Sequence, residues 1–147
     1  MSTDTNADEQ PVLLLDTSAA IALVLEDHDA HAAMVDIARG RRRGLAGHAY
    51  FETYSVLTRL PADLRRSPAD AERLLAHNFP ESVFLSEAVT ATFGAELARL
   101  GIAGGSVYDA LVGAAARHCG TPLLTRDARA RTTYGTLGVI LEPIVRP

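Results

Sequence analysis

The chain has 147 residues, of which 48% are hydrophobic and 22% are charged, and its formal net charge at pH 7 is −4. A folded chain of this length buries about two thirds of the surface that it exposes when unfolded, and this composition excludes a disordered or fibrous protein. All 14 basic residues are arginine and Cys119 is the single cysteine, which excludes a P-loop, a Schiff-base lysine and an internal disulfide.

Residues 1–10, MSTDTNADEQ, are polar and show no periodicity, so they predict a disordered tail ahead of a single domain over residues 11–147. This opening lacks the basic and apolar regions of a signal peptide. No apolar run reaches the roughly eighteen residues that a membrane span needs. We therefore expect a cytoplasmic protein without a membrane segment.

The first half of the domain alternates strands with helices. The apolar run VLLL at 12–15 predicts a strand buried on both faces. Apolar residues with a period near 3.6, followed by Gly40 in one case and Pro61 in another, predict helices with defined ends. The predicted strands cover residues 12–15 and 44–48, a charged loop covers 40–43, and the predicted helices cover 18–25, 30–39 and 50–60.

The second half continues this alternation. Ser67, Pro68 and Asp70 form a capping sequence at the start of one helix. Ser86 and Ser106 are the expected caps of two later helices, and a glycine is expected to end each of them. The predicted helices cover 68–77, 87–100 and 107–118, with a helical turn at 128–132, and the predicted strands cover 83–85, 123–125 and 137–141.

Five strands with helices between them predict an α/β fold, a three-layer α/β/α sandwich around a mostly parallel sheet. In such sheets ligands bind beyond the carboxyl ends of the strands. Asp16 and Asp127 each follow a predicted strand. This edge of the sheet is therefore the expected site.

Four acids are set into apolar runs: Asp16 in LLLDTS, Glu52 in AYFETYSVL, Asp109 in SVYDALVGAAA and Asp127 in LLTRDA. A carboxylate drawn toward a core is costly unless it is paired, hydrogen-bonded or bound to a metal. Only Asp127 has an arginine three or four positions away, Arg131, whereas Glu52 has His48 at that spacing. Ion pairs with neighbours along the chain therefore do not account for most of these four carboxylates.

Each acid has a structural alternative when it is taken singly. Asp16 and Asp127 could cap helices, Ser106 with Asp109 fits a capping box, and Glu52 fits an exposed helix position. Together, however, four acids at one end of a sheet would repel one another unless a divalent cation neutralised them. Oxygen ligands without a Cys or His cluster favour Mg²⁺, for which Mn²⁺ can substitute.

The four motifs, in this order, resemble the PIN-domain nucleases, and within them the VapC toxins of bacterial toxin–antitoxin pairs. They are LDTS at 15–18, FET at 51–53, DALVGAAA at 109–116 and LLTRD at 123–127. The resemblance implies a PIN-like fold and a Mg²⁺-dependent endoribonuclease that hydrolyses RNA phosphodiester bonds. Its catalytic and metal-binding residues would be Asp16, Glu52, Asp109 and Asp127. It also implies a cognate antitoxin and a homodimer.

Two further groups of residues have predicted roles around this centre. The hydroxyls of Ser18 and Thr125 are suited to orient the carboxylates or metal-bound waters, and they are equally suited to capping. Arg41, Arg42 and Arg43 form the densest basic run, which predicts either a phosphate-binding patch for RNA or a solvated loop.

Other functions remain open at this point. A non-toxin RNA-processing nuclease, or a non-catalytic module that binds RNA or protein, would share the same fold. His28 and His31, three residues apart, weakly suggest zinc, but no further Cys or His stands at a suitable spacing. A haloacid-dehalogenase-type phosphatase would need a second Asp where Ser18 stands, and a dinucleotide-binding domain would need a glycine fingerprint after the first strand.

Overall fold

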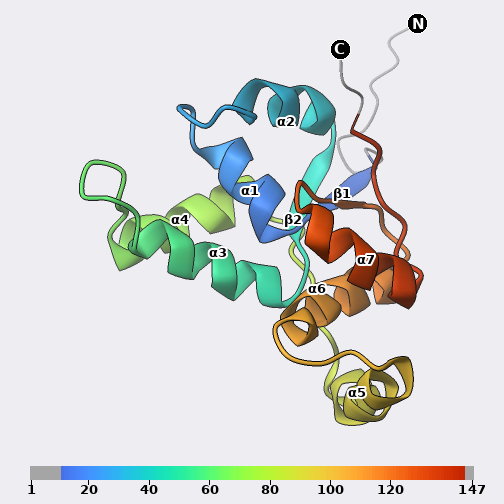
Figure 1. The fold of residues 1–147 in the computed structure, drawn as a ribbon. Coiled ribbons are helices and arrows are strands. Elements are labelled where there is room, and N and C mark those ends of the chain that lie inside the picture. The colour runs from blue at the N-terminus through green and yellow to red at the C-terminus, as the bar shows by residue number, and fades with distance from the viewer. Residues whose placement is uncertain (1–10, 145–147) are drawn as a thin grey trace, which may run out of the picture.

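A computed structural model describes residues 11–144 of the chain, so the tail predicted for 1–10 lies outside the described residues. Three parallel strands form the sheet: β1 (Val12–Leu15), β2 (Arg42–Leu45) and β3 (Leu123–Leu124). Their order is β2-β1-β3, with β1 in the centre. The central apolar run therefore becomes the inner strand, as its lack of polar residues predicts. Figure 1 shows the strands between two groups of helices.

The prediction of five strands is wrong, because two of the segments contribute only isolated bridges, Ala46 with Val83 and Leu123 with Leu141. Beside β2, the Ser82 hydroxyl accepts the Leu45 amide at 3.0 Å, so a side chain takes a position that a strand backbone would occupy. At the other edge, a helix extends through residue 137, where a strand was predicted.

Seven helices cover this sheet within residues 11–144. They are α1 (Thr17–Val24), α2 (His31–Ala38), α3 (His48–Thr58), α4 (Pro68–Asn78), α5 (Glu87–Leu100), α6 (Ser106–Cys119) and α7 (Ala128–Leu137). None of them combines the length and the hydropathy that a membrane-spanning helix needs.

Several helix ends follow the predicted chemistry. The Ser67 hydroxyl accepts the Asp70 amide at 3.1 Å, and the Ser86 hydroxyl accepts the Val89 amide at 3.2 Å. Gly101 ends α5 in the left-handed conformation, with φ of 68°. Ser106 is the first residue of α6 and not its cap, so the predicted capping box with Asp109 does not form.

Two helix boundaries differ more widely from the prediction. Helix α3 begins at His48, inside a predicted strand, because Gly47 adopts a positive φ of 52° and ends the extended segment. Helix α7 has ten residues where a single turn was predicted, and the buried residues Thr133 and Tyr134 lie in its added turn. Tertiary packing outweighs the low helix propensity of threonine and tyrosine here.

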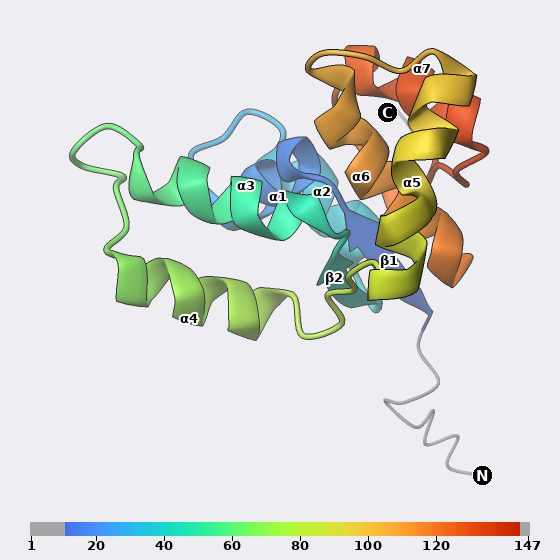
Figure 2. The ribbon, with the colours of Figure 1, turned by 90° about the horizontal axis from the view of Figure 1, so that it is seen from below.

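The core has two layers because β1 alternates its side chains between the faces of the sheet. Leu13 and Leu15 pack with residues of α1 to α4, and Leu14 packs with residues of α6 and α7. Figures 1 and 2 show these two groups of helices on opposite sides of the strands. The predicted three-layer α/β/α arrangement is confirmed.

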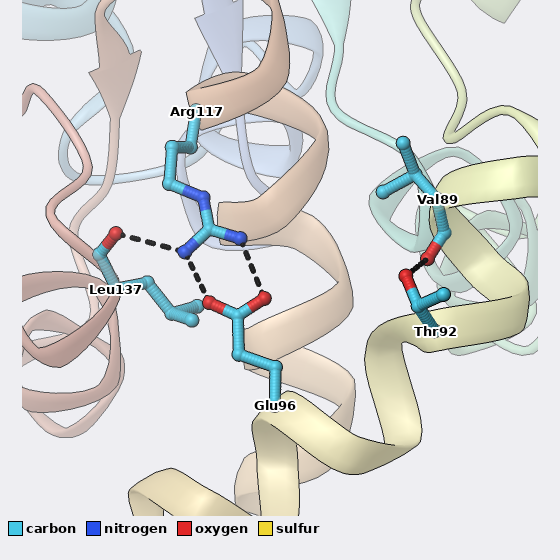
Figure 3. Close-up of polar contacts among 5 residues, drawn as sticks. All are labelled: Val89, Thr92, Glu96, Arg117 and Leu137. Carbon is cyan, nitrogen blue, oxygen red and sulfur yellow. Dashed lines mark hydrogen bonds and ion pairs between the residues drawn. The ribbon is translucent and has the colours of Figure 1, made fainter.

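Helix α5 lies outside α6 and α7 and is tied to them by one arginine. Arg117 of α6 donates to both carboxylate oxygens of Glu96 in α5, at 2.6 and 2.9 Å, and to the carbonyl of Leu137 in α7 at 3.2 Å (Figure 3). The Thr92 hydroxyl, also drawn there, donates within α5 to the Val89 carbonyl. The end of α7 is thus held against α6.

Candidate functional site

The carboxyl ends of β1 and β3 open into a cavity of about 190 Å³ that contains all four acids predicted from the sequence. The Asp16 amide donates to the Leu124 carbonyl at 3.1 Å, so the two strand ends lie side by side. The residues that line the cavity are Asp16, Thr17, Ser18, Glu52, Asp109, Val112, Asp127 and Tyr134.

Asp16 is the most deeply placed of these acids, with 4% of its surface exposed. It caps α1, because Oδ1 accepts the Ala19 amide at 3.2 Å, and the same oxygen accepts the Ser18 hydroxyl at 2.6 Å. Oδ2 accepts the hydroxyl of Tyr134 at 2.9 Å. The capping role predicted as an alternative is therefore real, and it coexists with a place in the cavity.

Burial raises the pKa of the Asp16 carboxyl above its ordinary value, and four hydrogen bonds oppose that rise. Their donors are the side chains of Ser18, Thr125 and Tyr134 and the amide of Ala19. The site therefore holds a carboxylate whose charge is costly and whose orientation is fixed by its partners.

The predicted hydroxyl pair, Ser18 and Thr125, links the two strand ends. The two oxygens lie 3.5 Å apart, the Ser18 hydroxyl accepts the Arg126 amide at 2.8 Å, and the Thr125 hydroxyl accepts the Asp127 amide at 3.1 Å. The backbone that carries Asp127 is therefore fixed relative to Asp16.

Asp127 caps α7, and its Oδ1 accepts the amides of Arg129 and Ala130 at 2.9 and 3.3 Å. The alternative ion pair with Arg131 does not form among residues 11–144. Oδ2 accepts no hydrogen bond from this part of the chain. One oxygen of Asp127 is therefore free to face a ligand.

Glu52 and Asp109 come from two helices that cross at the cavity, α3 and α6. Within residues 11–144 neither side chain has a hydrogen bond or an ion pair, and Glu52 is exposed while Asp109 is half-buried. Gly47 permits the close approach of the helices, because a Cβ there would meet the Ala115 Cβ at 3.0 Å. Among residues 11–144, neither Glu52 nor Asp109 therefore has a partner that would account for its charge on structural grounds.

The charges of the four acids act on one another. Burial raises the pKa of the Asp109 carboxyl, and the negative charges of Asp127, Glu52 and Asp16 raise it further. The other three acids are thus close enough to Asp109 for their charges to disfavour its ionisation. A positively charged ligand would relieve this repulsion.

Sequence reasoning missed Tyr134, which lies in α7 with 1% of its surface exposed. Burial, and then the charge of Asp16, raise the pKa of its hydroxyl, so it stays protonated and donates to Asp16. Gly113 of α6 makes this placement possible, because a Cβ there would meet the Tyr134 ring at 2.9 Å. A tyrosine on an amphipathic helix resembles an ordinary core residue, so nothing in the sequence indicated the contact between Tyr134 and Asp16.

The donor chemistry of the cavity fits a hard divalent cation, because four carboxylates and the hydroxyls of Thr17, Ser18 and Tyr134 line it, and its lining among the described residues includes no basic side chain. Within residues 11–144, however, no three Asp, Glu, His or Cys side chains are already arranged to hold a metal ion. Binding would therefore draw the exposed carboxylates of Glu52 and Asp127 inward.

Two other predicted groups lie away from the cavity. Arg41 and Arg42 pair with Glu142 and Glu81 at 2.6 and 2.5 Å, at the start of β2 and so at the opposite end of the sheet from Asp16. The predicted charged loop is thus partly a strand, since Arg42 and Arg43 belong to β2.

His28 and His31 have structural roles. The His28 ring accepts the Ala30 amide at 3.0 Å, and Nδ1 of His31 lies 3.0 Å from the Ala22 carbonyl. Residues 11–144 offer them no third metal ligand. The weak suggestion of zinc is therefore not supported.

The chain is similar in sequence to named ribonucleases and in fold to a solved structure. The PIN domain family matches residues 13–135. Ribonuclease VapC27 of Mycobacterium tuberculosis is 51% identical over 130 residues, which cover 88% of this chain and 95% of that protein. Ribonuclease VapC40 of the same species is 42% identical over 131 residues, which cover 86% of this chain and 95% of VapC40. A chain in the structure of FitAB bound to the IR36 DNA fragment superimposes with a TM-score of 0.60 at 16% identity, over 88% of this chain and 93% of that one, which shows a common fold.

Proposed function

The chain belongs to the PIN-domain family, and from this premise we propose that its acidic cavity is the divalent-metal site of an endoribonuclease toxin of the VapC class. The named ribonucleases that it matches over nearly their whole length support the activity and the toxin role. The observation that carries the site is the common cavity of Asp16, Glu52, Asp109 and Asp127, in which the other three charges disfavour ionisation of Asp109.

We assign metal binding to these four carboxylates, directly or through water, with Mg²⁺ as the natural ion and Mn²⁺ as a substitute. When bound, the ion would polarise the scissile phosphate and activate a water molecule for attack. Asp16 is held for this role by Ser18 and Tyr134, which fix one oxygen each. Ser18 and Thr125 also keep the backbone of Asp127 in place. The chain supplies orientation and negative charge, and no covalent intermediate is required.

Replacement of Asp16 by Asn tests this proposal. Asn caps helices as well as Asp does and can accept the Ser18 and Ala19 hydrogen bonds, so the fold should persist. Cleavage of single-stranded RNA in Mg²⁺ should fall about a hundredfold or more, because metal charge stabilisation contributes several kcal/mol. The matched control is Asp63→Asn, which makes the same charge change at an exposed loop residue. Cleavage by Asp16→Asn at the parent rate, or full activity in excess EDTA, would contradict the proposal.

RNA contact by Arg41, Arg42 and Arg43 stays a prediction. Two of the three already pair with acids, and Arg43 forms no ion pair within residues 11–144. Any phosphate that they bind would lie at the other end of the sheet from the acidic cavity, because β2 begins there. Their contribution would be to affinity and to its salt dependence, not to the reaction.

A cognate antitoxin and a second copy of the chain are the protein partners that we propose. Glu52 and Asp109 face the cavity without an ion pair among the described residues, so a basic side chain of an antitoxin could neutralise them in place of a metal. Phe51, on the same helix as Glu52, leaves 60% of its surface exposed and offers apolar area to a homodimer. Both partners would assemble around α3.

A further inference from the structure

A second cavity, of about 250 Å³, adjoins the acidic one and shares two of its acids. Its lining residues are His48, Glu52, Gly105, Tyr108 and Asp109. The rings of His48 and Tyr108 stack on each other, with centroids 5.1 Å apart and planes at 28°. The cavity therefore has an aromatic wall on one side and leads to the acidic site on the other.

His48 and Tyr108 lie on the same two helices as Glu52 and Asp109. His48 stands four residues before Glu52 on α3, which places both on one face of that helix, and Tyr108 directly precedes Asp109 in the first turn of α6. Gly105 leaves the cavity open, because a Cβ there would meet no atom within 4 Å. The two rings therefore lie beside the proposed catalytic site.

Core packing does not explain Tyr108. Its side chain leaves 55% of its surface exposed and belongs to none of the hydrophobic clusters in residues 11–144. An exposed tyrosine stacked on a half-buried histidine beside the proposed cleavage site is suited to stack on a base, because bases of single-stranded RNA stack on aromatic side chains.

The charge of the cavity selects which part of a nucleotide can enter. Glu52 and Asp109 repel phosphate, so the backbone must stay where a cation screens it, at the acidic site. The uncharged base is the part of the nucleotide that can occupy the neighbouring aromatic cavity. We propose that His48 and Tyr108 bind a base of single-stranded RNA adjacent to the cleaved phosphodiester bond. This inference rests on the endoribonuclease function proposed above.

An abasic scan of the RNA tests it. The wild-type protein should cleave an oligoribonucleotide about tenfold more slowly when one particular nucleotide next to the cleaved bond lacks its base. Tyr108→Leu should slow cleavage of the intact RNA by a similar factor and lose the penalty at that abasic position, whereas Tyr108→Phe should behave as wild type. The control is Phe84→Leu, an exposed aromatic residue, 52% accessible, that does not line this cavity.

A binding measurement separates this inference from the proposed function. The fluorescence of 2-aminopurine at the same RNA position should be quenched on binding to Asp16→Asn protein, and the quenching should be lost when Tyr108→Leu is added. Quenching without any RNA cleavage by the wild type would refute the nuclease and support the base site. Equal quenching with and without Tyr108, or an abasic penalty that Tyr108→Leu leaves unchanged, would overturn the base site.

Discussion

At the residue scale, the site depends on how Asp16 is held. Both of its oxygens accept hydrogen bonds, and Tyr134 and Thr125 supply donors from outside its own helix turn. The Tyr134 hydroxyl stays protonated because burial and the nearby acids raise its pKa. We therefore infer that Tyr134 is a positioning residue, which orients the carboxylate that we propose as a metal ligand.

Tyr134→Phe removes that hydrogen bond and little volume. We expect the affinity for Mn²⁺, measured by the spectroscopic signal of the free ion, to fall about tenfold, because partners that orient metal ligands typically contribute that much. Tyr54→Phe is the matched control, since Tyr54 is half-buried in α3 and its hydroxyl forms no hydrogen bond within residues 11–144. An unchanged Mn²⁺ affinity in Tyr134→Phe would show that Asp16 needs no such support.

At the element scale, the close packing of α6 and α7 brings Tyr134 to Asp16. Gly113 lies under the Tyr134 ring and the Leu137 side chain, so the two helices approach at a position that admits no Cβ. Helix α7 thereby continues through Leu137, where the sequence predicted a strand. Gly113 thus allows the close helix packing that places the Tyr134 hydroxyl against Asp16.

Gly113→Ala should destabilise the protein by about 1–2 kcal/mol in urea unfolding. A Cβ there would meet buried Tyr134 and Leu137 atoms at 2.9 and 3.1 Å, and this overpacking outweighs the gain in helix propensity. Gly94→Ala in α5 is the matched control, because its Cβ would meet nothing within 4 Å, and it should stabilise by about 0.5–1 kcal/mol. Equal effects of the two substitutions would mean that α7 can move away from α6 without cost.

The sequence predicted the elements whose signals are local, and it predicted less well where tertiary contacts decide. The caps Ser67 and Ser86 are in the predicted places because each bonds an amide within its own turn. The last predicted strand is instead the end of α7 and a single bridge at Leu141, since packing against α6 extends the helix. The four acids were found because unpaired charge in apolar runs is visible in a sequence, whereas the Tyr134 contact spans 118 positions.

At the scale of the whole molecule, the acidic cavity lowers the stability of the folded state at neutral pH. The pKa values of Asp16 and Asp109 are raised, so their protonated forms are favoured in the folded state. The stability that this contributes is fully present below the unfolded pKa of about 4 and is lost as the pH rises through the raised folded value. At neutral pH, without metal, the ionised cavity therefore destabilises the protein.

Asp16→Asn should accordingly be more stable than the wild type in EDTA at pH 7.5. We expect Tm to be higher by about 3 °C, the equivalent of about 1 kcal/mol for a chain of this size. The difference should vanish only when the pH falls below about 3, where Asp16 is protonated in both states, because an unfolded aspartate has a pKa of about 3.9. Asp63→Asn, with the same change in net charge at an exposed position, should show no such gain. A lower Tm for Asp16→Asn at pH 7.5 would refute the electrostatic cost.

Anomalous diffraction from crystals of the wild-type protein grown with Mn²⁺ would locate the ion. We expect an anomalous peak in the cavity between Asp16 and Asp109, with the carboxylates of Glu52 and Asp127 drawn toward it. A cavity without a peak at saturating Mn²⁺, or an ion bound only elsewhere on the surface, would contradict the claim that these acids form one metal site.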